Sequence, residues 1–167
     1  MARWFLAVIC LCLAGCQTVQ HDTQSGRPEV TIAAPSETVK TAFVGIMTNF
    51  GYALKRDSNF QIVMERPVHN VVMNLLLASE YDPTLEARVS ATVLDLGART
   101  RLTADMGVVR NAGTGFEAVT SANNSPDSSG LQNLLDEIKT DLERGMSVEQ
   151  VITKASARTI TARDKPG

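Results

Sequence analysis

The sequence contains few of the residues on which most catalytic and metal sites depend. Only two of its 167 residues are histidines and three are cysteines, and aromatic residues make up 5% of the chain. No Gly-x-Ser-x-Gly motif occurs, and His69 has no second histidine or cysteine at ligand spacing. The segment Gly113-x-Gly115 lacks the third glycine of a phosphate-binding loop. We therefore expect no catalytic residues, no metal and no cofactor.

Charge of one sign and long apolar runs are also scarce. The chain has 16 basic and 18 acidic side chains, a formal net charge of −2, which gives no electrostatic footprint for nucleic acid. After residue 15 no apolar run approaches the roughly 20 residues that a helix needs to cross a bilayer. The length and an apolar content of 44% indicate one globular domain.

The first 16 residues read as an export signal. Arg3 provides a short positive region, and an unbroken apolar stretch runs from Trp4 to Leu13. The motif Leu13-Ala14-Gly15-Cys16 resembles the lipobox of bacterial lipoproteins, and the resemblance covers residues 1–16. It implies cleavage of residues 1–15 and acylation of Cys16, which would anchor the protein durably to a membrane. The alternative is an ordinary secretory signal that ends in a cysteine.

The same resemblance implies a location. Gln17 follows the cysteine, and in enteric bacteria a residue other than aspartate at this position directs a lipoprotein to the outer membrane. We therefore expect a lipid-anchored protein on the periplasmic face of the outer membrane. With Cys10 and Cys12 removed and Cys16 acylated, no thiol would remain for a disulfide, a metal or catalysis.

The residues between the lipobox and the first periodic segment predict a tether. Residues 16–28 are polar and lack periodicity, so we expect a flexible coil that spans about 20 Å. His21 lies in this segment, and we expect it to be solvated.

The rest of the chain alternates between strand-like and helix-like patterns. Ser36 is the expected N-cap of a helix that ends at Gly51, and Asp127 or Ser128 is the expected N-cap of a second helix that ends at Gly145. Ser147 and Gln150 form a capping box for a short helix to about residue 156. Strands are expected at 29–32, 52–56, 60–66, 87–93 and 102–108, and the connection 111–130 allows one more around 116–119.

This order predicts an α+β fold: a single antiparallel sheet of about five strands with two main helices packed on one face. The domain would span residues 29–145, followed by a short helix and a frayed tail over residues 146–167. The segment Thr31–Val39 is similar to the start of helix-grip domains, including START-like lipid binders, and to domains of BamC-type lipoproteins of the outer-membrane barrel-assembly machine. The helix-grip resemblance implies a cavity for an apolar ligand.

Residues 68–79 are the most apolar stretch after the lipobox. Five of them share one helical face: Val68, Val71, Val72, Leu75 and Leu76. A third core helix or a buried strand is the favoured explanation, because short apolar runs usually belong to a core. The functional alternatives are a lid over an apolar cavity, with His69 and Asn70 at its mouth, or a patch that docks a partner or a membrane.

Three functions remain open at this point. The first is a non-enzymatic accessory lipoprotein that binds a protein partner in the cell envelope. This function is suggested by a lipid anchor, a tether and a compact domain without catalytic residues. The second is a carrier or sensor of an apolar small molecule such as a lipid. The third is an enzyme that uses Glu80, Asp82 and Glu86, although a solvated loop followed by a strand edge explains these carboxylates better.

Overall fold

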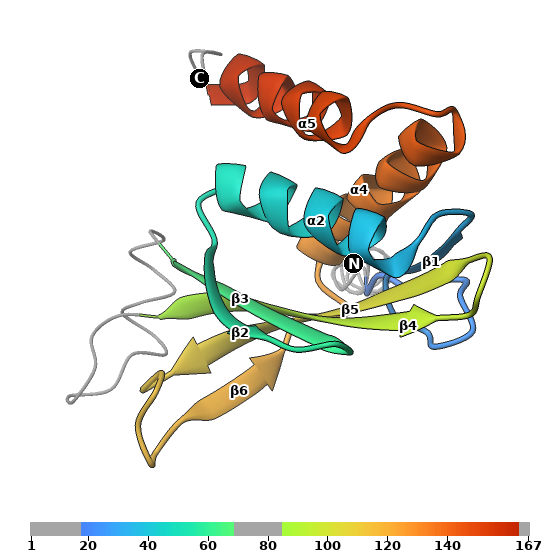
Figure 1. Ribbon diagram of the computed structural model, residues 1–167. Helices are drawn as coiled ribbons and strands as arrows, with labels where there is room; N and C mark the ends of the chain where they lie inside the picture. The colour runs from blue at the N-terminus through green and yellow to red at the C-terminus, as the bar shows by residue number, and fades with distance from the viewer. Residues whose placement is uncertain (1–17, 69–84, 164–167) are drawn as a thin grey trace, which may run out of the picture.

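The computed structural model describes residues 18–68 and 85–163, with side chains to residue 157. In this part of the chain a single antiparallel sheet of six strands carries three helices (Figure 1). The strands are β1 (Glu29–Ile32), β2 (Ala53–Asp57), β3 (Gln61–Pro67), β4 (Glu86–Asp95), β5 (Thr100–Arg110) and β6 (Ala118–Ser121). The helices are α2 (Ser36–Asn49), α4 (Pro126–Glu143) and α5 (Val148–Arg163).

The strand order is β1-β5-β4-β3-β2, and β6 joins the sheet beside β5. One edge of β5 is shared by two short strands. β1 pairs with its first half, Thr100 to Thr103, and β6 pairs with its second half, Gly107 to Arg110. The other edge of β5 pairs with β4 along its whole length. The sheet therefore ends in three strand edges, on β1, β6 and β2.

All three helices lie on one side of the sheet, and no helix of the described residues covers the opposite face, which we call the open face (Figure 1). α2 and α4 bury an apolar stripe on the sheet, and α5 packs mainly on α2. Gly45 makes this contact close, since a Cβ there would lie 2.4 Å from Cδ1 of Ile152. The largest fully buried side chains include Phe43, Ile46, Ile62, Met64, Leu102, Leu135 and Ile138.

The fold class predicted from the sequence is confirmed, with several differences in detail. The sheet has six strands rather than five, because the short strand after β5 forms at Ala118–Ser121. The Ser147 and Gln150 capping box is present, with reciprocal bonds of 2.9 and 3.3 Å. α2 and α4 begin earlier than expected, with Pro35 and Ser125 at their N-cap positions.

The last helix differs most from its prediction. It extends to Arg163 instead of ending near residue 156, and Val151 and Ala155 are buried in the core. Residues 148–157 therefore belong to the folded unit, which continues beyond the expected boundary at residue 145. The reason is that α5 packs on α2, which stabilises a helix whose own sequence pattern is weak.

Residues 18–28 also differ from the expected tether, because they lie against the domain. The Val19 amide donates to the Asn124 carbonyl at 3.1 Å. His21, expected to be solvated, is half-buried, and its Nε2 lies 2.9 Å from the Ser128 hydroxyl. The Arg27 guanidinium forms an ion pair with Asp105 at 2.6 Å.

Several sequence predictions fall on residues outside those described. They are the signal peptide at 1–15, the lipobox with Cys16, and His69, Val71, Val72, Leu75, Leu76, Glu80 and Asp82. Val68 is described, and its amide donates to the Leu85 carbonyl at 2.8 Å. The predictions for the other residues remain predictions.

Candidate functional site

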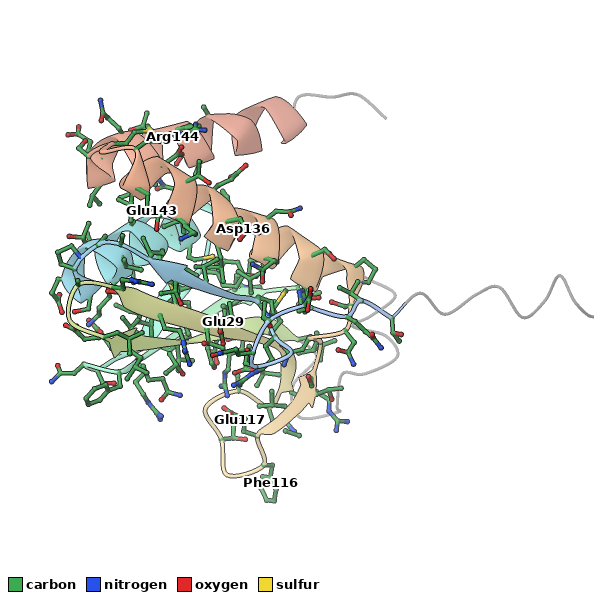
Figure 2. All side chains as sticks on the ribbon, turned by 90° about the vertical axis from the view of Figure 1, so that its right-hand side faces the viewer. Glu29, Phe116, Glu117, Asp136, Glu143 and Arg144 are labelled. Carbon is green, nitrogen blue, oxygen red and sulfur yellow. The ribbon has the colours of Figure 1, made fainter. Side chains whose placement is uncertain are left out.

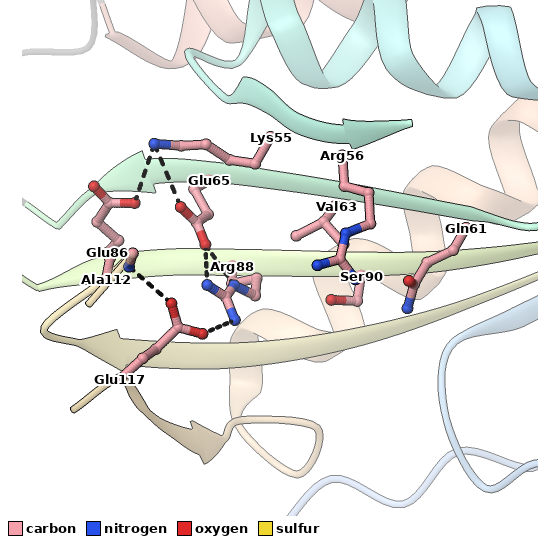
Figure 3. A pocket seen from close by; sticks show the side chains of 11 residues that line it. Lys55, Arg56, Gln61, Val63, Glu65, Glu86, Arg88, Ser90, Ala112 and Glu117 are labelled. Carbon is pink, nitrogen blue, oxygen red and sulfur yellow. Dashed lines mark hydrogen bonds and ion pairs between the residues drawn. The ribbon is translucent and has the colours of Figure 1, made fainter. Parts of the chain in front are cut away.

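The open face of the sheet carries a hollow of about 380 Å³, shown in Figure 3. Strand alternation places every second residue on this face, where polar side chains replace the apolar ones that face the helices. Charged residues of both signs line the hollow from three strands and from the β5–β6 loop: Lys55, Arg56, Glu65, Glu86, Arg88 and Glu117.

Arg88 is the centre of this charged group. It lies opposite Glu65 on β3 and opposite Gly107 on β5. Its Nε and Nη2 both contact Oε1 of Glu65, while its Nη1 donates to Oε1 of Glu117 at 2.6 Å. Arg88 therefore links strand β3 to the β5–β6 loop. A Cβ at Gly107 would lie 2.7 Å from Cγ1 of Val119, so the glycine allows β6 to pack closely on this part of β5.

Arg88 favours the charged form of two carboxylates, Glu65 and Glu117. Burial favours a higher pKa for Glu65, but hydrogen bonds with Glu86 and Arg88 and the charges of Arg88 and Lys55 outweigh it and lower that pKa. The hydrogen bond from Arg88, together with one from the Gly113 amide, lowers the pKa of Glu117 to about 2. Glu65 and Glu117 are therefore ionised near neutral pH and have no proton to donate as general acids.

The β5–β6 loop, residues 111–117, is built from its own hydrogen bonds. Asn111 adopts a positive φ of 52°, and its carbonyl accepts from the amide and hydroxyl of Thr114 at 3.2 and 2.8 Å. The Phe116 amide donates to the Thr114 hydroxyl at 3.1 Å. The Gly113 amide donates to Oε2 of Glu117 at 2.9 Å, so the ion pair with Arg88 fastens the whole loop to the sheet.

This loop holds an aromatic side chain in water. Phe116 is 85% exposed and projects away from the sheet at the tip of the loop (Figure 2). Val119, on β6, is 53% exposed. A second hollow of about 190 Å³ lies beside it, lined by Met106, Gly107 and Ser121 among others. We refer to Phe116, Val119 and the strand β6 together as the β6 surface.

The three strand edges differ in how they are protected. α4 covers the β1 edge: Gln132 bonds both the amide and the carbonyl of Glu29, and Lys139 donates to the Thr31 carbonyl at 2.6 Å. The β2 edge carries Lys55, Arg56 and Asp57 in succession and a bulge between Leu54 and Arg56. Charges and bulges of this kind discourage strand pairing.

The β6 edge has neither kind of protection in the described part of the chain. The strand consists of Ala118, Val119, Thr120 and Ser121, which carry no charge, and β5 is its one described partner. β6 therefore presents backbone donors and acceptors next to the exposed side chains of Phe116 and Val119.

The sheet and the helices share one apolar core in the described residues. Large buried side chains from both layers make up this core. Over residues 18–68 and 85–157 no group of three or more metal-ligating side chains occurs. Within the same part of the chain no helix is long and apolar enough to cross a bilayer.

Most residues of this site were not predicted from the sequence. Glu65 lies on strand β3 but is only 5% exposed, because Arg88 covers it. Glu86 was considered together with Glu80 and Asp82, which lie outside the described residues, and its Oε2 lies 3.9 Å from Nζ of Lys55. The one feature of the sequence that points to Phe116 is its position among turn-forming residues. An aromatic residue in a loop is not accounted for by a place in the core.

Comparison of the sequence with protein-family models and with curated protein sequences gives no match.

Proposed function

We propose that the protein is a lipid-anchored periplasmic accessory protein whose domain binds a protein partner through the β6 surface without catalysing a reaction. The observation that carries this proposal is the exposure of Phe116 on a loop fastened by its own hydrogen bonds. Burying Phe116 plays no part in holding the described fold together, and aromatic anchors of this kind dominate the energetics of protein interfaces.

The arrangement of the loop favours tight binding. A loop whose backbone is already held in place loses little further conformational entropy when its side chains dock. The Glu117–Arg88 ion pair and the bonds of Asn111 and Thr114 provide that order before a partner arrives. The edge of β6 adds backbone groups that can pair with an extended segment of the partner.

The anchoring part of the proposal rests on the lipobox alone. Acylation of Cys16 would hold the domain at a membrane, and the outer membrane is the location that Gln17 implies. The intact mass of the protein extracted from membranes tests this step. We expect a chain that starts at Cys16 with added acyl mass, and a Cys16→Ser variant that leaves the membrane fraction.

The partner-binding step is tested by photo-crosslinking in the native envelope. A photoreactive phenylalanine analogue at position 116 should give a discrete crosslinked protein. Phe60, in the turn between β2 and β3, is the matched control because it is a 64% exposed phenylalanine outside the β6 surface. Equal crosslinking patterns at positions 116 and 60, or none at position 116, would contradict the proposal.

The alternative of an apolar carrier receives no supporting observation from the described residues, whose buried side chains form one core cluster. Enzymatic activity also lacks one, because the carboxylates of the hollow are committed to ion pairs.

A further inference from the structure

Residues 18–28 connect the lipidation motif to the domain, and the described structure binds them to one end of it. The Val19 amide bonds to the carbonyl of Asn124, which lies between β6 and α4. His21 contacts the Asn123 carbonyl at 3.3 Å and the Ser128 hydroxyl at 2.9 Å. Segments far apart in the sequence therefore meet at the start of α4.

The histidine contact is a directed one. The Ser128 hydroxyl donates its hydrogen to the Ser125 carbonyl at 2.7 Å, and the Asn123 carbonyl can only accept. With the proton on Nε2, His21 donates to both groups. Ser128 is fully buried, so His21 bonds to a fixed group inside the domain.

Asn123 joins the same segment to the sheet. Its side-chain oxygen accepts from the Met106 amide at 2.7 Å, and its side-chain nitrogen donates to Asp105 at 2.9 Å. Asp105 in turn pairs with Arg27. The N-terminal segment is thus fixed at both ends, by His21 on α4 and by Arg27 on β5.

We propose that this docking leaves the protein no flexible tether and holds the α4 start, around Asn124 and Pro126, at the lipid headgroups. This inference rests on the acylation of Cys16 in the proposed function. Only Gln17 separates Cys16 from Thr18, and two residues span at most about 7 Å. That distance is about the depth of one headgroup layer.

The partner of this end of the domain is the headgroup layer. The lipid anchor brings the domain close to it, and no part of the domain inserts into the bilayer. The large exposed apolar side chains of the described residues are Leu54, Phe60, Leu94, Leu96, Phe116 and Val119, and none of them belongs to this end. The end carries Asp22 and Asp127, both exposed, which do not attract anionic lipids. The domain without acyl chains should therefore not bind vesicles.

This orientation sets the height at which the β6 surface meets a partner. Asn123 lies seven positions after Phe116, so Phe116 lies at most about 25 Å from the anchored end. The partner of the β6 surface must then reach close to the membrane.

α4 provides a ruler for a test, because its 18 residues span about 27 Å. Asn124 lies just before its start and Arg144 at its end, and both are exposed. A fluorophore on Asn124→Cys or on Arg144→Cys would report the two heights separately.

The acylated full-length chain is placed in phosphatidylcholine vesicles that contain a headgroup spin-labelled lipid. We expect quenching to be several times stronger at position 124 than at position 144. A flexible insert of 12 Gly and Ser residues between Gln17 and Thr18, which spans about 19 Å, should abolish the difference. A His21→Ala variant should reduce it.

Equal quenching at the two positions of an acylated protein, or a difference that survives the insert, overturns the docked orientation and leaves the anchor intact. An intact mass without acyl chains overturns both this inference and the anchoring part of the proposed function. Vesicle binding by a Cys16→Ser protein would show that the end inserts by itself, which also contradicts the inference.

Discussion

Replacing Arg88 by methionine tests whether the charged group orders the β6 surface. The side chain of Glu65 is 4% exposed and that of Arg88 is 19% exposed, so the variant leaves a buried carboxylate without its main partner. Loss of one member of a buried ion pair typically costs about 3–5 kcal/mol of unfolding free energy. Lys55, whose Nζ lies 3.5 Å from Oε2 of Glu65, retains part of the compensation.

We therefore expect Arg88→Met to lower the free energy of unfolding by about 2–4 kcal/mol, measured by urea denaturation near neutral pH. The bond to Glu117 adds little to this loss, because an exposed ion pair contributes about 0–1 kcal/mol. The double variant Arg88→Met/Glu65→Met should recover most of the stability, because it removes the unpaired charge as well.

Arg56→Met is the matched control, since Arg56 lines the same hollow and is exposed. It should change the free energy of unfolding by less than about 0.5 kcal/mol. A loss below about 1 kcal/mol in Arg88→Met, or a double variant as unstable as the single one, would refute the assignment of Arg88 as the partner that compensates Glu65.

Three further outcomes follow from described contacts. Because the pKa of Glu117 is lowered to about 2 from 4.5, its contribution to loop order is fully present above pH 4.5 and is lost as the pH falls toward 2, and NMR titration of its carboxyl in Arg88→Met should show a higher pKa. Gly45→Ala should lower the melting temperature because its Cβ would meet Cδ1 of Ile152, and adding Ile152→Val, which removes that atom, should restore it. Lys154→Met should destabilise the packing of α5 by about 2 kcal/mol, since it leaves the 3%-exposed Asp141 without the cation that contacts both its oxygens at 2.7 Å, and recovery in Lys154→Met/Asp141→Asn would confirm the cause.

The sequence was sufficient to predict the sheet and its main helices. Burial of one face imposes local patterns that can be recognised without knowing what packs against them. These patterns are the alternation of apolar residues in Ala87–Val93 and Leu102–Val108 and the apolar stripe of α4. The capping box of α5 is equally local.

The site depends on relations that no local pattern contains. Glu65 and Arg88 face each other only in the register that β3 and β4 adopt, and Glu117 reaches Arg88 from the loop between β5 and β6. Residues 18–28 are held to the domain by single hydrogen bonds and an ion pair of polar residues. Such contacts leave no periodic pattern in the sequence, so the docking could not be predicted from it. For α5 the missing information was the face of α2 on which it packs.

The most direct test of the central claim compares two phenylalanine variants in binding to the protein that crosslinks at position 116. The account predicts that Phe116→Ala weakens the affinity tenfold or more, about 1.4 kcal/mol, while Phe60→Ala binds like the unchanged protein. Both variants should keep the unfolding midpoint of the unchanged protein, since both side chains are exposed. Unchanged affinity in Phe116→Ala, or an equal loss in both variants, would contradict a partner-binding role for the β6 surface.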